Sequence, residues 1–196
     1  MVFKEPKMNK DIEKWEKYNG VTFLRKVGLR PGQIVLDFGC RVGHYTIPAA
    51  FATGSKGIVY AVDKEQQALN ELELKAGANN LKNVKVIKTV GQATLDFEGE
   101  SIDVVLFYDI LHYLGKRDRK KLYQEAQRVL KKDGFLSVYP KHTMEDNPAR
   151  EFRTLNISDV KREVEESGFY FEEKVCGTMS HDDTLTQGCV LNFRKK

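Results

Sequence analysis

Short apolar runs alternate with longer amphipathic segments along most of this chain, and this alternation limits the possible folds more than any other feature. Apolar runs of this kind are typical of parallel strands that helices cover on both faces. Five strands are expected, at residues 34–39, 58–63, 84–89, 103–109 and 135–140, with helices at residues 65–76 and 119–130. The sequence therefore predicts an α/β three-layer sandwich with a mostly parallel sheet.

The last third of the chain departs from this alternation. A helix is expected over residues 157–168, with Ser158 or Asp159 as its cap, followed by apolar runs at 169–175 and 189–196. Only a loop rich in Gly, Thr and Asp is expected between those runs, which predicts an antiparallel C-terminal β-hairpin. With 196 residues, 41% of them hydrophobic, the chain fits one domain at 28–196 behind an N-terminal helical extension at 1–27.

Charge and cysteine content limit the partners and the compartment. The formal net charge is +4, from 32 basic and 28 acidic residues spread along the chain, so no nucleic-acid partner is expected. No stretch approaches the ~18 apolar residues of a membrane span, so no membrane partner is expected either. Three cysteines without a C-x-x-C pair fit reduced thiols better than a disulfide framework or a zinc site, which indicates the cytoplasm and no metal.

A glycine-rich turn follows the first expected strand, in the stretch VLDFGCRVGHYTIP at 35–48. Gly39 and Gly43 allow the backbone of a strand-to-helix turn to approach a polar or anionic ligand at the carboxyl edge of a sheet. The next strand ends at Asp63, 24 residues after Gly39 (63 minus 39), close to the ~20 expected for an acid that binds both ribose hydroxyls. The turn and the acid together predict a nucleoside-type ligand.

Several motifs in order give the chain a family resemblance. From about Val21 to the C-terminus it resembles a class I S-adenosylmethionine-dependent methyltransferase, which has a Rossmann-like fold. The five matching motifs are VLDFGCRVG, VYAVDKEQQAL, VGQATLDF, SIDVVLFYDILHYL and RVLKKDGFLSVY. The resemblance implies a seven-stranded sheet whose antiparallel seventh strand lies between the fifth and the sixth, with S-adenosylmethionine as the cofactor.

The same resemblance implies a set of cofactor-binding residues. They are Asp37, Gly39, Cys40, Gly43, Asp63, Lys64, Gln92, Ala93 and Phe107. Asp63 would hold the ribose, Gln92 and Ala93 would flank the adenine, and Asp37 would lie with the two glycines at the methionine end. The backbone carbonyl of Phe107 would meet the cofactor's ammonium group.

Two positions depart from the family pattern. Arg41 stands midway between the glycines, where the family usually has a third glycine, and Gln92 stands where it usually has aspartate. Gln92 keeps a carbonyl acceptor, so that change is mild. A positive φ at Arg41 would cost energy that a glycine avoids. Its side chain either points outward or clamps a carboxylate.

Three other functions remain as alternatives to methyl transfer onto a small molecule. A dinucleotide-binding fold would require G-x-G-x-x-G, and the chain has G-x-x-x-G instead. Arg41 leaves open a methyltransferase-like module that binds the cofactor without turnover. An RNA or protein acceptor is the third alternative. The short additions outside the core favour a small molecule, and the chain is expected to be a monomer or a homodimer.

Candidate catalytic residues follow the fourth expected strand. Asp109 and His112 are three positions apart (112 minus 109) and would share one face of a helix, so either could serve as a general base. In the structural alternative, Asp109 caps that helix and His112 packs under a lid. His142 and His181 lie on expected loops at the same edge, where a plain surface role is favoured for each.

Two aromatic residues of the N-terminal extension are candidates for a lid. Trp15 and Tyr18 are three apart (18 minus 15) and could share one face of a helix over the acceptor site. Packing of these rings onto the sheet is the favoured interpretation.

Overall fold

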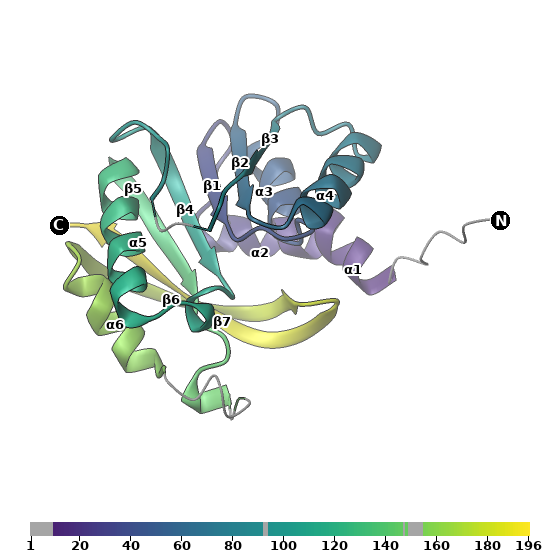
Figure 1. The fold of residues 1–196 in the computed structure, drawn as a ribbon. Helices are drawn as coiled ribbons and strands as arrows, with labels where there is room; N and C mark the ends of the chain where they lie inside the picture. The colour runs from purple at the N-terminus through teal and green to yellow at the C-terminus, as the bar shows by residue number, and fades with distance from the viewer. Residues whose placement is uncertain (1–9, 92–93, 147, 149–154) are drawn as a thin grey trace.

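The computed structural model describes residues 10–91, 94–146, 148 and 155–196, and it contains a seven-stranded sheet (Figure 1). The strands follow the order β3-β2-β1-β4-β5-β7-β6 across the sheet. Their bounds are β1 Ile34–Phe38, β2 Ile58–Asp63, β3 Val84–Lys88, β4 Ile102–Tyr108, β5 Leu130–Tyr139, β6 Phe169–His181 and β7 Thr184–Lys195. The first five strands are parallel to one another, and β7 runs antiparallel between β5 and β6. The predicted fold, including the inserted seventh strand, is confirmed.

Helices cover both faces of the sheet. The α-helices are α1 Lys10–Lys14, α2 Gly20–Val27, α3 Thr46–Thr53, α4 Gln66–Ala78, α5 Lys116–Val129 and α6 Ile157–Glu165. One face packs against α2 and α3, with α4 over β2 and β3, and the other packs against α5 and α6. The buried side of α5 includes Leu122, Ala126 and Val129, which follow one another at helical spacings of four and three residues. Asn156 caps α6 instead of Ser158 or Asp159, because its side-chain oxygen accepts from the Asp159 amide at 2.8 Å.

The N-terminal segment forms a continuous helical stretch, in which a π-helical turn, Trp15–Asn19, joins α1 to α2. Trp15 is fully buried in the same core cluster as residues of β1, β4 and β5, and its indole Nε1 donates to the His44 carbonyl at 2.9 Å. Tyr18 is 66% exposed. Trp15 therefore packs into the core as favoured, whereas Tyr18 does not. The division at residue 27 stays a prediction.

The C-terminal hairpin is much longer than predicted. Residues 176–188 form no open loop: β6 and β7 remain paired as far as His181 and Thr184. The pairing of β7 with β5 covers only Leu191–Arg194, so the distal half of the hairpin extends beyond the carboxyl end of β5. Figure 1 shows this extension as a long two-stranded arm reaching away from β5. The strands continue because opposed Thr, Met, Val and Leu side chains suit paired strands, and this overrides the turn-forming composition.

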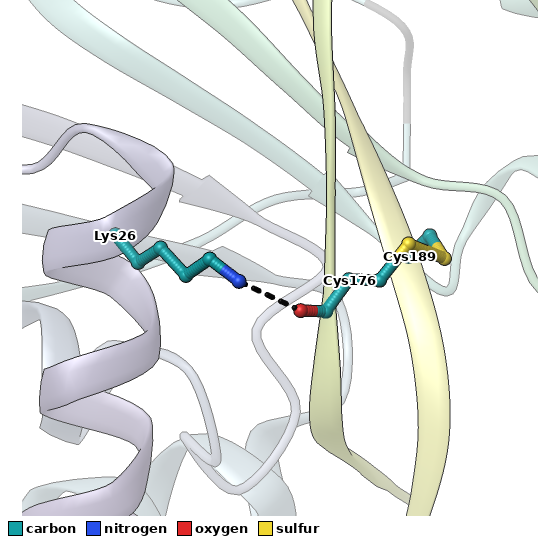
Figure 2. The surroundings of a disulfide bond; sticks show 3 residues. All are labelled: Lys26, Cys176 and Cys189. Carbon is teal, nitrogen blue, oxygen red and sulfur yellow. Dashed lines mark hydrogen bonds between the residues drawn. A yellow bond between two sulfur atoms is a disulfide. The ribbon is translucent and has the colours of Figure 1, made fainter.

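A disulfide bond joins the two strands of this arm. Cys176 and Cys189 lie directly opposite each other and are bonded, and Lys26 of α2 donates to the Cys176 carbonyl at 3.2 Å (Figure 2). The prediction of three reduced thiols is therefore wrong, since only Cys40 is a free cysteine. The hairpin register brings Cys176 and Cys189 together, which the odd number of cysteines did not indicate. The cysteine content therefore no longer indicates a reducing compartment. Within the described part of the chain, no helix has the length and apolarity to cross a membrane.

Candidate functional site

The glycine turn after β1 is held in a backbone conformation that favours glycine. Gly39 and Gly43 have φ values of 82° and 87°. A Cβ atom at Gly39 would lie 2.3 Å from Cγ2 of Ile110, and one at Gly43 would lie 2.3 Å from Cδ1 of Leu72. The missing side chains therefore let this turn pack directly against the segment after β4 and against α4.

The amides of the turn are used largely within the protein. The amides of Gly39 and Cys40 both donate to the Val62 carbonyl, at 2.8 and 3.2 Å, and the Gly43 amide donates to Cys40 at 2.9 Å. Because these donors already have partners, the turn shapes the site more than it supplies amide donors to a ligand. This differs from the expectation that its amides reach an anion.

Asp63 links the glycine turn to the end of β2. Its Oδ2 accepts from the backbone amide of Arg41 at 2.8 Å, and its Oδ1 accepts from the amide of Glu65 at 2.9 Å. The residue is 7% exposed. Each carboxylate oxygen can accept a further hydrogen bond, so Asp63 is equipped to receive two adjacent hydroxyl groups of a ligand.

Arg41 adopts the left-handed backbone conformation, with φ of 45°. Its Nη1 lies 2.5 Å from Oδ1 of Asp182 at the tip of the β6–β7 hairpin, and both side chains are more than half exposed. The arginine therefore points outward to a carboxylate of the protein itself. The Asp63 acceptor holds the strained peptide unit in place.

Asp37 is a buried carboxylate on β1 below the turn. It is 2% exposed, and its Oδ2 accepts from the Thr46 hydroxyl at 2.6 Å. Burial, together with the nearby Asp63 charge, raises the pKa of Asp37 to about 7 against the opposing effect of the Thr46 hydrogen bond. This carboxyl group can therefore change its charge near neutral pH.

The remaining cofactor candidates in the described part of the chain differ in burial: Cys40 and Phe107 are buried, and Lys64 is exposed. Cys40 is buried, and desolvation raises the pKa of its thiol far above the usual range, so it is unreactive. Phe107 is fully buried in β4, while Lys64 is exposed immediately after Asp63. Gln92 and Ala93 lie outside the described residues.

The predicted catalytic pair lies at the carboxyl end of β4. Asp109 has φ of 56° and caps no helix, since the 3-10 turn that follows, Leu111–Tyr113, starts without a side-chain cap. Its Oδ1 lies 3.6 Å from Nδ1 of His112. Burial raises the pKa of Asp109 and lowers the pKa of His112 to about 4, so the imidazole is neutral at pH 7. The structure brings the two together, and their catalytic role stays a prediction.

Two histidines that the sequence analysis assigned to the surface join this pair. His181 Nδ1 lies 2.6 Å from Asp109 Oδ2, and His142 Nε2 lies 3.8 Å from Asp109 Oδ1. The rings of His112 and His142 have centroids 4.4 Å apart, and those of His142 and His181 4.9 Å apart. The position of His142 just after β5 was an available signal. The approach of His181 depends on the hairpin length, which the sequence did not reveal.

The hairpin tip is attached to the cofactor side of the molecule as well. The Tyr45 hydroxyl donates to the Ser180 carbonyl at 2.6 Å, and the His44 ring, with Nε2 3.4 Å from Asp183, bonds on its other side to buried Glu16 at 2.8 Å. The tip therefore contacts both the glycine turn and Asp109. It therefore joins the predicted cofactor site at the glycine turn to the predicted catalytic pair at the end of β4.

Comparison with known proteins identifies a family. Residues 35–134 match the family model described as a methyltransferase domain, which is just over half of the chain. A probable cobalt-precorrin-6B C(15)-methyltransferase (decarboxylating) of Saccharolobus solfataricus is 30% identical over 116 residues, covering 59% of this chain and 56% of that protein. A demethylmenaquinone methyltransferase of Lactobacillus johnsonii is 28% identical over 116 residues, covering 59% of this chain and 47% of that protein. The chain thus spans about half the length of these curated relatives.

Solved structures extend the similarity to the whole fold. A SAM-dependent methyltransferase from Aquifex aeolicus has a TM-score of 0.74 and 22% sequence identity, with 95% of this chain and 98% of that chain covered. At that identity the likeness supports the fold alone, including the antiparallel hairpin. Together with the family match, it shows that the chain belongs to the class I S-adenosylmethionine-dependent methyltransferase family.

Proposed function

We propose that this protein binds S-adenosylmethionine at the glycine turn and transfers its methyl group to a small-molecule acceptor near Asp109. One observation carries the proposal: Asp63 is nearly buried, holds the Arg41 amide, and retains acceptor capacity on both oxygens. A carboxylate in this position suits the two hydroxyls of a ribose. The cofactor would then lie at the ends of β1 and β2.

The residues around the turn fit the chemistry of the cofactor. Asp63 would accept from the ribose hydroxyls, and Asp37, when ionised, would favour the positive charge of the methionine ammonium. The left-handed turn at Gly39 and Gly43 allows close packing of the backbone beside the proposed cofactor position. Phe107 would contribute its backbone carbonyl. When bound, the cofactor supplies an activated methyl group on a sulfonium.

The main contribution of the protein to such a reaction is alignment and exclusion of water. Orientation of two reactants can supply roughly 7–11 kcal/mol in favourable cases. The hairpin tip contacts the glycine turn through Asp182 and the end of β4 through His181, so it can cover both reactants at once. A general base is then optional. If one acts, Asp109 is the better candidate, because His112 is buried and weakly basic.

A small acceptor is the substrate class that the covered edge supports. Four side chains converge at this edge, three beside the carboxyl ends of β4 and β5 and one from the hairpin tip: Asp109, His112, His142 and His181. The two relatives named above carry names of enzymes acting on a precorrin and on demethylmenaquinone, both small molecules.

Calorimetric titration tests the cofactor half of the proposal. Wild-type protein should bind S-adenosylmethionine and S-adenosylhomocysteine but not NAD. Asp63→Ala should lower the affinity at least about tenfold, which corresponds to one or two lost charge-assisted hydrogen bonds. Asp118→Ala, which removes an exposed carboxylate in the first turn of α5, is the matched control and should bind as wild type.

Turnover tests the catalytic half. Production of S-adenosylhomocysteine in the presence of quinol, tetrapyrrole and other hydroxylated small molecules should exceed the rate without acceptor. Cofactor binding without turnover on any such compound would favour the non-catalytic module instead. Failure of the wild-type protein to bind S-adenosylmethionine at all would overturn the proposal.

A further inference from the structure

We infer that Asp109, His142 and His181 bind a divalent transition-metal ion, with zinc as the reference ion, at the acceptor edge of the sheet. No metal site is expected from the sequence, because the cysteines lack metal-ligand spacing and a surface role is favoured for both histidines. The fold instead assembles two imidazoles and one carboxylate, the donor set of several catalytic metal sites.

The three side chains come from segments far apart in the chain. Asp109 follows β4, His142 follows β5, and His181 ends β6 at the hairpin tip. One potential ligand atom from each lies within 4.8 Å of the others. Parallel neighbours β4 and β5 bring the first two together, and the extended hairpin adds the third.

The spacing is close to what an ion requires. Zinc binds imidazole nitrogen and carboxylate oxygen at about 2.1 Å, so ligand atoms around a tetrahedral ion lie roughly 3.4 Å apart. Asp109 Oδ2 lies 2.6 Å from His181 Nδ1, and Asp109 Oδ1 lies 3.8 Å from His142 Nε2, so the three side chains are close to the spacing that an ion requires. Small movements of these half-buried side chains would complete the geometry.

Backbone strain and unused acceptor capacity both support a bound ion. Asp109 and His142 have positive φ values of 56° and 54°, conformations that cost energy and concentrate at functional sites. The Oδ1 atom of Asp109 is buried and accepts no hydrogen bond from the described residues. An ion at this point would satisfy that oxygen.

A second carboxylate lies behind one of the proposed ligands. His181 presents Nδ1 toward Asp109, and its Nε2 lies 3.8 Å from Oδ2 of Asp182. Metal-bound histidines usually direct the other ring nitrogen to a carboxylate or carbonyl, which fixes the ring orientation. The Asp109, His181 and Asp182 side chains follow this arrangement.

The donor set also predicts which ions the site accepts. Imidazole ligands suit zinc, cobalt, nickel and iron, whereas magnesium prefers oxygen ligands and retains its water. Three protein ligands leave at least one coordination position open, as in catalytic rather than structural zinc sites. The open position can take an oxygen of a small molecule.

The part that the ion plays in methyl transfer rests on the proposed function, although metal binding itself does not. An acceptor hydroxyl bound to the ion would have a lowered pKa and release its proton to solvent. Its oxygen lone pair would form the new C–O bond, while the C–S bond breaks and the sulfur keeps that electron pair. S-adenosylmethionine is the only co-reactant required.

Zinc uptake by the 196-residue protein without cofactor tests the site. After removal of metals by chelator and dialysis without reductant, titration should show one zinc per chain, and magnesium should not compete. Asp109→Asn, His142→Gln and His181→Gln each remove a direct ligand, so each should lower zinc affinity by more than the ~10–100-fold typical for loss of an outer-shell partner. Two control variants, His44→Gln and Asp183→Asn, should bind zinc as wild type.

Two readouts separate loss of a ligand from loss of the fold. Cobalt(II) should give a visible absorption spectrum in wild type and controls that the three ligand variants lack, while far-ultraviolet circular dichroism stays unchanged in all. Saturating zinc should also raise the Tm of wild type but not of the ligand variants. A folded wild-type protein that takes up no zinc, or ligand variants that keep wild-type affinity, would overturn the inference while leaving the cofactor titration unaffected.

Discussion

The Asp63 carboxylate accepts the backbone amide of Arg41 at 2.8 Å, and this bond connects the ends of β1 and β2 at the centre of the candidate cofactor site. Arg41 has φ of 45°, a backbone conformation that is unfavourable for a residue with a side chain, and the hydrogen bond from its amide helps to hold that conformation. The acid of the second motif therefore has a structural task besides its proposed ribose contact. Loss of Asp63 should loosen the turn as well as remove ligand acceptors.

Arg41→Gly should leave cofactor affinity within about twofold of wild type. The arginine points to Asp182, and this pair is more than half exposed, so its loss costs at most about 1 kcal/mol. Glycine relieves a left-handed conformation worth about 1–2 kcal/mol, offset by its greater chain entropy. Calorimetry and urea denaturation measure the two quantities. A tenfold loss of affinity would instead show that Arg41 clamps the cofactor.

Asp37→Asn should change the pH dependence of stability in a defined direction. The folded-state pKa of about 7 exceeds the usual 3.8, so the native state binds a proton that the unfolded state has released between these values. Stability from this group is therefore lost as pH rises from about 4 to 7. A neutral Asn avoids the loss, with an upper limit of roughly 4 kcal/mol at pH 8.

The comparison must be made as wild type minus variant at each pH, because another group acts in the opposite direction. His112 has its pKa lowered to about 4, so the unfolded state binds its proton first, and stability from His112 rises between about pH 4 and 6.5. The difference between Asp37→Asn and wild type removes that contribution. If the difference in unfolding free energy between the two proteins, measured without cofactor, were the same at pH 5 and pH 8, the raised pKa would be contradicted.

The sheet and its chemistry could be predicted from sequence where local patterns carry the information. The run at β1 is apolar throughout, the glycine turn follows it, and Asp63 ends the next strand, so each element identifies itself within a few residues. The periodic apolar positions of α5 identified its buried side for the same reason. Such features need no knowledge of distant contacts.

The hairpin arm and the acceptor edge could not be predicted in the same way. Residues 176–188 contain Gly, Thr and Asp, which favour turns locally, and only pairing between β6 and β7 makes them strands. The Cys176–Cys189 bond and the approach of His181 to Asp109 both depend on that register. Since the hairpin was expected to be short, both cysteines were expected to be reduced.

Removal of the disulfide should destabilise the hairpin arm. The bonded cysteines are 13 residues apart, and closing a loop of this size in the unfolded state is worth about 3 kcal/mol. The double variant Cys176→Ser/Cys189→Ser should therefore have a Tm lower by roughly 6–12 °C. Hydrogen exchange should increase mainly in the distal half of the hairpin.

Reductant provides the matched control for this prediction. Dithiothreitol should lower the Tm of the wild-type protein toward that of the double variant and leave the variant itself unchanged. Buried Cys40 is present in both proteins, so any effect on the variant would have to come from that residue. A wild-type Tm that ignores reductant would contradict the expected stabilisation.

The ion pair between α5 and α6 should be the most sensitive charged contact outside the site. Arg119 and Glu163 form two parallel hydrogen bonds of 2.8 Å, and the side chains are only 7% and 6% exposed. Glu163→Ala leaves the guanidinium buried without its carboxylate, which should cost about 3–5 kcal/mol of unfolding free energy. Glu166→Ala, at an exposed position just after α6, should change it by less than about 0.5 kcal/mol.

A double replacement separates the cost of an unpaired charge from the value of the pair. Arg119→Met/Glu163→Leu removes both charges and keeps apolar volume, so its stability in urea denaturation should return to within about 1 kcal/mol of wild type or exceed it. Arg119 also donates to the Leu114 carbonyl at 2.7 Å. The double variant loses that hydrogen bond, which reduces the stability it can recover. If the double variant were as unstable as Glu163→Ala, the pair itself would be stabilising the contact between α5 and α6. Recovery would show that the buried pair serves mainly to fix how these helices dock.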